Sequence, residues 1–246
     1  MSAKREGEET VGRSRVRGER VASQVAADVG ASPGSPFPVI LSSPSGGGKT
    51  TIAQQLLERR EDLGYSVSCT TRAARPGETH GKDYYFLTRE EFLARRERGD
   101  FAESAEVHGN LYGTLRSEIG RVLAAGKHVI MDIDVQGARQ MVRAFPQSVT
   151  IFVLPPSGEV LLRRLRGRKT ESPQQLVARL HSALRELRAV EEYEYVVVND
   201  DLTTAVTRVG SILDAEVVSR ERVSGLRQQV ATLIERLEAE IGQHSS

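Results

Sequence analysis

The segment SSPSGGGKTT, residues 42 to 51, has the residue types and the spacing of a loop that binds phosphate. The pattern G-x-x-x-x-G-K-[ST] joins a strand to a helix and directs backbone N–H groups at an anion. Gly48, Lys49 and Thr50 fit its last three positions, whereas Ser43 stands where the pattern begins with glycine. A glycine-rich turn with a chance lysine is the alternative. The order of apolar run, loop and helical stretch favours the phosphate loop.

The residue types in this loop each have a use in nucleotide chemistry. Gly46 and Gly47 allow the backbone to approach phosphate closely. Lys49 has the length to reach the β- and γ-phosphates, and the Thr50 hydroxyl is placed to bind Mg²⁺. The loop alone indicates a bound nucleotide, because ATPases, GTPases and kinases share it. A regulatory GTPase is disfavoured, since the chain lacks the base-reading motif N-K-x-D and its last apolar run ends VVVNDD.

Further anion-binding residue types follow the loop. Arg72 and Arg75 lie in TTRAARPGE, Tyr84 lies in GKDYYF, and Tyr112 lies in GNLYGT. Arginine binds phosphate with bidentate geometry, and a phenol hydroxyl can add a hydrogen bond. A single arginine is more often a solvated surface charge. Its grouping here with glycine- and proline-rich turns favours a second phosphate site.

Four short apolar runs predict the scaffold that positions these residues. FPVIL, HVIMDID, VTIFVLP and YVVVN are typical of buried parallel strands, and three of them precede helical periodicity. This alternation predicts an α/β fold with a parallel sheet flanked by helices. Residues 65 to about 113 are turn-rich with short strand-like stretches, so we expect an inserted, mainly antiparallel lobe there.

Helix signals flank these runs. TREEFLARRER begins with Thr88 and Glu91 at capping-box spacing and stops at Gly99, which predicts a short helix. Ser172 and Pro173 are placed to cap and start another helix after a basic loop. A helix near the C-terminus is predicted to dock its apolar face on the core or on a second subunit. That face comprises Leu226, Val230, Leu233, Ile234, Leu237 and Ile241.

Composition narrows the class of protein. Among 246 residues, 39% are hydrophobic and 27% charged, with a formal net charge of +1, which does not indicate a nucleic-acid binder. The apolar runs are too short to cross a bilayer, so no membrane partner is expected. The single cysteine, Cys69, excludes an intrachain disulfide and a multi-cysteine metal site, and it fits a small buried hydrophobe in a reducing, cytoplasmic protein.

The first 36 residues are predicted to form a disordered tail, because charged residues give way to Ala, Gly, Ser and Pro without an apolar stretch. A transit peptide is the weaker interpretation. Acidic residues interrupt the basic ones at Glu6, Glu8, Glu9 and Glu19.

The motifs in order resemble the guanylate kinase family. SSPSGGGKTT, SVSCTTRAARPGE, GKDYYF, GNLYGT, IMDIDVQGA, LPPS and VVVNDDL follow the order and approximate spacing of that family from residue 38 to about 211. The resemblance implies Mg²⁺-assisted, in-line phosphoryl transfer from ATP to GMP, and to dGMP, in a P-loop NTPase core with an inserted GMP-binding lobe and a helical lid.

The resemblance also implies an organisation of the chain and an assignment of its site residues. The kinase domain is expected at 37–211, with the lobe at about 66–122, the lid at about 164–178 and a C-terminal helical extension at 212–246; a monomer or a homo-oligomer joined through that helix is expected. The implied ATP-binding residues are Ser45, Gly46, Gly47, Gly48, Lys49, Thr50 and Thr51. The implied GMP ligands are Arg72, Arg75, Tyr84 and Tyr112 for the phosphate, and Ser68, Glu103, Thr114 and Asp132 around guanine. The implied catalytic cations are Lys49, Arg72 and the lid arginines Arg164, Arg168 and Arg179.

Chemistry supports two of these assignments directly. Guanine offers two adjacent donors, N1–H and N2–H₂, which one carboxylate such as Glu103 can accept, although a surface position is the commoner fate of a strand glutamate. Asp132 follows an apolar strand and, with Thr50, is a candidate Mg²⁺ ligand; Asp134 is the second candidate. In the lid, Lys169 stands where the family often has glycine.

Three other functions stay open beside this one. Guanylate-kinase-like domains also occur as non-catalytic interaction modules, but the intact Gly48, Lys49 and Thr50 argue against that. A kinase for another phosphate, such as a sugar phosphate, would have no need of Ser68, Glu103 and Thr114 together. A plain ATPase would not explain the second anion site.

Overall fold

The computed structural model describes residues 34–107, 109–166 and 173–244 of the chain. The predicted tail lies almost entirely outside these residues, as do Arg168, Lys169 and the rest of the lid segment 167–172. The chain divides into two compact units. One runs from Pro36 to Glu216, and the other combines Met1–Ser35 with Val217–Ser246.

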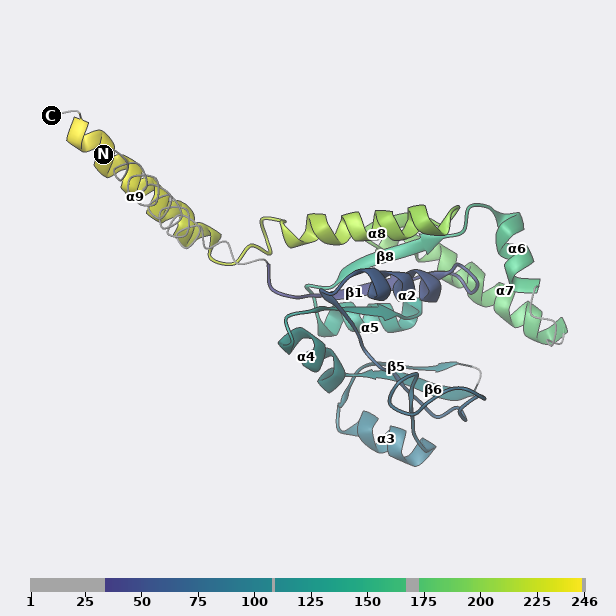
Figure 1. The fold of residues 1–246 in the computed structure, drawn as a ribbon. Coiled ribbons are helices and arrows are strands. Elements are labelled where there is room, and N and C mark those ends of the chain that lie inside the picture. Colours follow the sequence, from purple (N-terminus) through teal and green to yellow (C-terminus); the bar gives the residue numbers. More distant parts are fainter. Residues whose placement is uncertain (1–33, 108, 167–172, 245–246) are drawn as a thin grey trace, which may run out of the picture. The chain divides into compact units, whose positions relative to one another are not determined.

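A five-stranded parallel sheet forms the centre of the first unit (Figure 1). Its strand order is β2-β7-β1-β8-β9, and β1 pairs with β7 on one side and β8 on the other. All five residues of β1 are buried, as expected for a strand covered on both faces. The four predicted parallel strands are confirmed. The sheet comprises β1 (Pro38–Ser42), β2 (Leu63–Tyr65), β7 (His128–Asp132), β8 (Val149–Leu154) and β9 (Tyr195–Val198).

Helices cover both faces of this sheet because its crossovers run in opposite directions. The connection through α2 leads from β1 outward to β2, whereas α5 leads from β7 back across β1 to β8. Right-handed crossovers in opposite directions place their helices on opposite faces. Figure 1 shows α5 below the sheet and α8 above it. The core helices are α2 (Lys49–Arg59), α4 (Arg116–Ala124), α5 (Val135–Ala144), α6 (Gly158–Arg166), α7 (Pro173–Arg188) and α8 (Leu202–Val217), with a short 3₁₀ turn η1 (Val190–Glu192).

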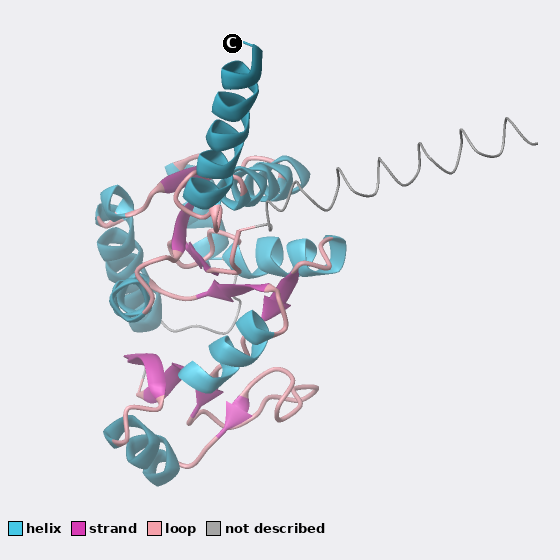
Figure 2. Ribbon diagram, turned by 90° about the vertical axis from the view of Figure 1, so that its left-hand side faces the viewer, coloured by secondary structure: helices cyan, strands magenta, loops and turns pink. Residues whose placement is uncertain are grey.

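The inserted lobe is built on a second sheet with the order β4-β3-β6-β5, and Figure 2 shows the two sheets as separate groups of strands. The capping box of Thr88 and Glu91 is formed, so the predicted helix α3 begins and ends where its signals indicated. A separate apolar cluster that includes Phe92 and Phe101, with stacked rings, supports the lobe. Its elements are β3 (Cys69–Thr70), β4 (Tyr85–Phe86), α3 (Arg89–Glu97), β5 (Phe101–Val107) and β6 (Asn110–Leu115).

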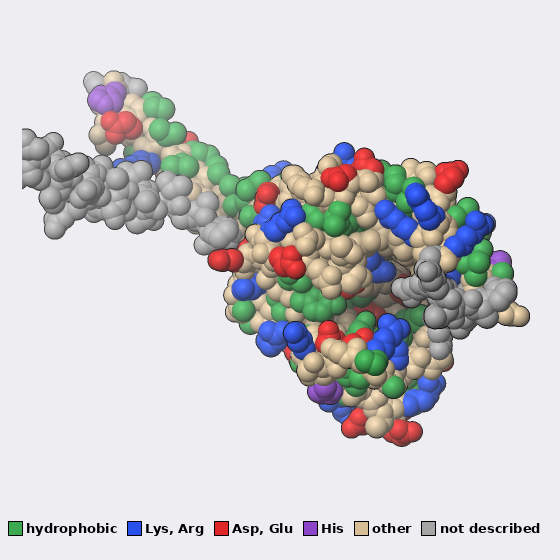
Figure 3. Space-filling view, turned by 45° about the vertical axis from the view of Figure 1, so that its right-hand side comes forward, with side chains coloured by type: hydrophobic (Ala, Val, Ile, Leu, Met, Phe, Trp, Pro, Cys, Tyr) green, Lys and Arg blue, Asp and Glu red, His purple; other side chains and the backbone are tan. Residues whose placement is uncertain are grey.

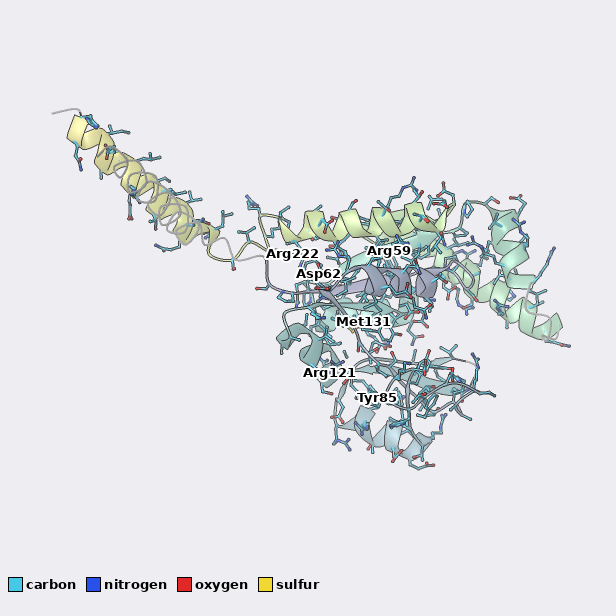
Figure 4. The ribbon with its side chains drawn as sticks, viewed as in Figure 1. Arg59, Asp62, Tyr85, Arg121, Met131 and Arg222 are labelled. Atoms are coloured by element: carbon cyan, nitrogen blue, oxygen red, sulfur yellow. The ribbon has the colours of Figure 1, made fainter. Side chains whose placement is uncertain are left out.

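A polar cluster fastens this lobe to α4. The carboxylate of Glu118 is almost buried, accepts the Tyr85 hydroxyl at 3.3 Å, and pairs with Arg121 at 3.0 Å. Figure 4 shows Tyr85 and Arg121 on these neighbouring elements. The other face of α4 packs Ile119 and Val122 against the central sheet, so α4 belongs to both layers.

Three details differ from the sequence expectations. Tyr65 ends the core strand β2 rather than starting the lobe, because the short run from Leu63 pairs with β7. The lobe is not purely antiparallel, since β3 and β4 pair in parallel. Helix α8 extends past residue 211 to Val217, and its fully buried Leu213 lies beyond the predicted domain end.

The described C-terminal part of the second unit contains α9 (Leu226–His244), which confirms the predicted helix. Within the described residues, none of the helices is both long enough and apolar enough to cross a bilayer. Cys69 is completely buried, as predicted, and burial raises the pKa of its thiol to about 12.

Candidate active site

The phosphate loop lies between β1 and α2, at the carboxyl edge of the central sheet. Gly48 is the residue before α2 and takes a left-handed conformation with φ of 99°, and Gly46 does so with φ of 84°. Residues with a Cβ rarely adopt such angles. The N-terminus of α2 therefore opens toward the loop with its N–H groups available to an anion.

Close contacts explain why Gly47 is a glycine and give a second reason for glycine at position 48. A Cβ at Gly47 would lie 2.6 Å from the Cβ of Ser43, so the serine at the start of the loop is accommodated by glycine four positions later. A Cβ at Gly48 would lie 2.4 Å from the Nδ2 of Asn199. The Asn199 amide is buried and donates to the carbonyl of Gly47 at 2.9 Å. Asn199 thus fixes the loop from the end of β9.

Helix α7 holds the loop from the other side, through Ser45. The Ser45 N–H donates to the carboxylate of Glu186 at 3.1 Å, and its Oγ accepts from Nη2 of Arg179 at 3.3 Å. Burial raises the pKa of Glu186, while its bond from the Ser45 N–H opposes that rise. Arg179 is almost buried, and its Nη1 donates to the carbonyl of Leu165 at 2.9 Å. Arg179 therefore connects the phosphate loop to α6.

Two further cations lie at the loop. Arg164, on α6, directs Nη1 at the carbonyls of Gly46 and Gly47, at 3.4 and 3.5 Å. Lys49 is the first residue of α2 and is half-buried. The structure thus brings three of the predicted catalytic cations, Lys49, Arg164 and Arg179, to the same loop; Arg168 lies outside the described residues.

Two oxygen ligands suited to a hard cation meet at the edge of the loop. The Thr50 hydroxyl donates to the carboxylate of Asp132, at the end of β7. The other carboxylate oxygen of Asp132 accepts the Tyr65 hydroxyl at 3.1 Å. Burial, and next the charge of Asp132, raise the pKa of Tyr65 far above its ordinary value. Mg²⁺ takes few protein oxygens and completes its shell with water and phosphate, so this pair fits it. Asp134 is instead the N-cap of α5 and accepts the N–H of Gly137.

In the lobe, a buried carboxylate faces the first turn of α5. Glu103 is 6% exposed and accepts the Thr114 hydroxyl at 2.7 Å, from the residue paired with it across β5 and β6. Ser68 Oγ lies 3.4 Å from the same hydroxyl. A Cβ at Gly137 would lie 2.9 Å from Glu103 Oε2, so glycine in α5 leaves room for the carboxylate. Burial raises the pKa of Glu103 to about 7.

Three of the four predicted acceptor phosphate ligands lie together: Arg72, Tyr84 and Tyr112. The two terminal nitrogens of Arg72 form a bidentate pair with Glu78, both bonds 2.9 Å long, and its guanidinium lies over the ring of Tyr84, 5.4 Å from the centroid. The Tyr84 and Tyr112 rings meet edge to face at 6.2 Å. The Glu78 carboxylate raises the pKa of Arg72. Arg75 stands apart with an exposed side chain, although its N–H donates to Glu78.

Figure 3 shows the surface hollowed between the core and the lobe, with acidic and basic side chains at the hollow.

Four residues that shape this site were not predicted from the sequence: Tyr65, Glu78, Glu186 and Asn199. Glu78 lies within TTRAARPGE and Asn199 within VVVNDDL, so the sequence carries a local signal for these two residues. Glu186 and Tyr65 bond to residues at least 67 positions away in the sequence, Ser45 and Asp132, so no local pattern identifies them.

A parallel sheet whose first strand leads through a glycine-rich loop into a helix that begins with Lys49 and Thr50 defines a P-loop nucleotide-binding protein. A family model described as "Guanylate kinase" matches residues 35–216. A guanylate kinase of Dechloromonas aromatica is 44% identical over 198 residues, covering 80% of this chain and 96% of that relative. One from Paramagnetospirillum magneticum is 48% identical over 196 residues, covering 79% and 92%.

A solved structure agrees with these sequence matches. The crystal structure of guanylate kinase from Anaplasma phagocytophilum superposes with a TM-score of 0.68 at 39% identity, covering 81% of this chain and 95% of that one. The chain therefore belongs to the guanylate kinase family, whose members are enzymes that phosphorylate GMP with ATP.

Proposed function

We propose that this enzyme transfers the γ-phosphoryl group of ATP to GMP, and to dGMP, forming ADP and the guanosine diphosphate. Family membership supports the reaction class. The single observation that carries the choice of acceptor is the buried Glu103 carboxylate, bonded to Thr114 beside Ser68 in the lobe. A glutamate is rarely buried unless its carboxylate has polar partners, and we infer that guanine is one of these partners.

The proposed base recognition follows from donor and acceptor positions. Glu103 accepts both N1–H and N2–H₂ of guanine, while the hydroxyls of Ser68 and Thr114 complete the polar rim. Adenine has no N1–H and would leave the carboxylate badly paired. A site built around buried polar groups rejects such a ligand by a factor on the order of 10⁴ to 10⁵. The proposed selection of guanine therefore rests on the buried Glu103 carboxylate and not on the residues that bind the acceptor phosphate.

The acceptor phosphate is proposed to lie against Arg72, Arg75, Tyr84 and Tyr112. In the structure Glu78 occupies the terminal nitrogens of Arg72 and holds its guanidinium over the Tyr84 ring. We infer that Glu78 orients Arg72 for the phosphate. The attacking oxygen belongs to GMP itself, whose phosphate has a second pKa near 6 and is largely dianionic at neutral pH. A general base is therefore unnecessary.

Catalysis is proposed to consist of alignment and charge neutralisation. The backbone N–H groups of the loop and Lys49 hold the β- and γ-phosphates, while Arg164 and Arg179 approach from α6 and α7. When Mg²⁺ is bound, Thr50 and Asp132 would hold it, and it would neutralise phosphate charge. Asn199 and Glu186 keep the loop in the geometry that these contacts need.

A lid movement is also proposed. Arg164 lies at the start of the predicted lid and Arg179 lies just after its end. They contact the phosphate loop from α6 and α7, respectively. Closure around two bound nucleotides would bring these cations to the transferring group and exclude water, which would otherwise accept the phosphoryl group.

The GMP ligands proposed here contact the base and the phosphate and not the sugar, so dGMP is expected to serve as an acceptor as well.

The test is product analysis with purified protein, ATP, Mg²⁺ and GMP. We expect ADP and GDP to form in equal amounts. The variant Lys49→Ala is expected to lose turnover by about 10³-fold, since it removes a charge that acts on the transferring group. Lys127→Ala is the matched control, because Lys127 is exposed on the turn before β7. ADP formation without GDP would contradict the proposal and indicate an ATPase.

A further inference from the structure

Helix α9 exposes a continuous apolar face. None of its residues is buried, although it carries large aliphatic side chains along its length. At 3.6 residues per turn, these side chains fall within an arc of about 100°. Leu226 is half-buried, and the others are exposed by 43% at Val230, 57% at Leu233, 49% at Ile234, 64% at Leu237 and 65% at Ile241.

A helix of this length needs that face covered. Most helical stability in proteins comes from packing an apolar face against another element rather than from intrinsic propensity. Three of the 19 residues of α9 have low helix propensity: Val230, Thr232 and Gly242. Exposed apolar stripes of this kind mark interaction surfaces.

The spacing of the face is symmetrical about its midpoint, between Leu233 and Ile234. Leu226 and Ile241 are equally distant from that point, and so are Val230 and Leu237. Two copies of α9 lying antiparallel about a two-fold axis at the midpoint would therefore bring each large aliphatic side chain opposite another. An isologous contact requires such a self-complementary surface, because the same residues of both copies face each other across the two-fold axis.

The charges beside the face suit the same arrangement. In an antiparallel pair about this axis, each flank of one helix meets the same flank of the other. Arg227 and Glu238 lie on one flank on opposite sides of the midpoint, and their distances from it differ by two residues, so opposite charges come within one helical turn of each other. Antiparallel packing also opposes the two helix dipoles favourably.

We propose that α9 joins two copies of this chain through antiparallel pairing of its apolar face. The pairing requires no residue of the nucleotide site, and it is independent of the phosphoryl-transfer reaction. The occupant of the face is thus a second α9, and each α9 is buried by its partner.

Sedimentation analysis of the full chain over about a hundredfold range of concentration tests the proposal. We expect a concentration-dependent dimer. Leu233→Lys is expected to leave a monomer at every concentration, because the new charges from the two copies would meet near the axis. Thr232→Lys lies on the opposite side of the helix and should leave the dimer intact. Unchanged kinase activity in both variants would show that the Pro36–Glu216 unit of each protein is folded.

Cysteine cross-linking tests the orientation, and the only native cysteine, Cys69, is buried. A chain carrying both Leu226→Cys and Ile241→Cys should form a covalent dimer on oxidation, because the two positions lie opposite each other in the antiparallel pair. Leu226→Cys alone should not. A wild-type monomer at all concentrations, a dimer that survives Leu233→Lys, or efficient cross-linking by Leu226→Cys alone would each overturn the proposal.

Discussion

The phosphate loop and the inserted lobe hold their proposed phosphates in different ways. The loop is built from backbone groups, with glycines at φ of 84° and 99° and with Asn199 and Ser45 contacts that fix its path. The lobe presents side chains from separate strands and turns, such as Arg72 for the acceptor phosphate and Glu103 for the base. The loop should therefore fail as a whole when one glycine changes, whereas the lobe should lose single interactions. The substitutions below test that difference.

Among the substitutions that compare the loop with the lobe, Gly48→Ala is expected to have the largest effect. Its Cβ would lie 2.4 Å from Asn199 Nδ2, and its φ of 99° is strained for any residue with a side chain. Displacement of the loop by about 1 Å costs on the order of 10²-fold in rate, so kcat/KM for ATP should fall at least that far. Steady-state kinetics with saturating GMP measures it.

Gly99→Ala separates strain from misplacement. Gly99 also has a positive φ, of 74°, but a Cβ there meets no atom within 4 Å and it lies beyond α3 in the lobe. We expect a modest loss of stability, roughly 1–2 kcal/mol, with wild-type kinetics. If Gly48→Ala lost no more activity than Gly99→Ala, the loop would not depend on its backbone geometry.

The next effect is expected for Glu103→Gln, which should reduce the preference for GMP over AMP. The amide can no longer accept both donors of guanine, and one of its own N–H groups faces them. Removing a charged hydrogen-bond partner costs about 1.5–3 kcal/mol, or about 10- to 150-fold in the ratio of kcat/KM values. Glu106→Gln, on the exposed side of the same strand, is the matched control. An unchanged ratio would remove Glu103 from base recognition.

Glu103 should also make stability depend on pH. Its pKa is raised from 4.5 to about 7 in the folded protein, because burial disfavours the charged form. The protonated form therefore stabilises the fold fully below pH 4.5, and this contribution is lost as pH rises through about 7. At about 1.4 kcal/mol per pKa unit the loss is up to about 3 kcal/mol. Denaturant unfolding should show Glu103→Gln gaining stability over wild type at pH 8 and little at pH 4; equal curves at both would contradict this.

The smallest effect is expected for Glu78→Gln. The bidentate pair with Arg72 becomes a single weaker bond, so the guanidinium is held less firmly over Tyr84. We expect KM for GMP to rise several-fold, about 1 kcal/mol, with KM for ATP unchanged. A lower KM for GMP would mean that Glu78 competes with the phosphate instead of orienting Arg72.

The same contrast explains how much of the site the sequence predicted. The loop was predictable because Gly48, Lys49 and Thr50 are required by geometry and charge at fixed spacing. Glu103 was indistinguishable from an exposed strand glutamate by local pattern, and only the family resemblance selected it. Its burial depends on Thr114 and on Gly137, which lies on a helix 34 positions later. Side-chain sites assembled from distant segments carry little local signal.

The fold shows the same difference between features with a continuous local pattern and features that depend on pairing between distant segments. The central strands were predictable because burial on both faces demands continuous apolar runs such as those of β1 and β8. The edge strand β2 was not, since three residues, Leu63 to Tyr65, pair with β7 without forming an apolar run. The parallel pairing of β3 and β4 likewise rests on two residues in each strand.

The most direct test of the account is the ratio of kcat/KM for GMP to that for AMP, measured for the wild-type enzyme at fixed ATP and Mg²⁺, with UMP and no acceptor as blanks. A buried carboxylate that selects guanine predicts a ratio on the order of 10⁴ or more. Comparable rates with AMP, or ADP release without an acceptor, would contradict it.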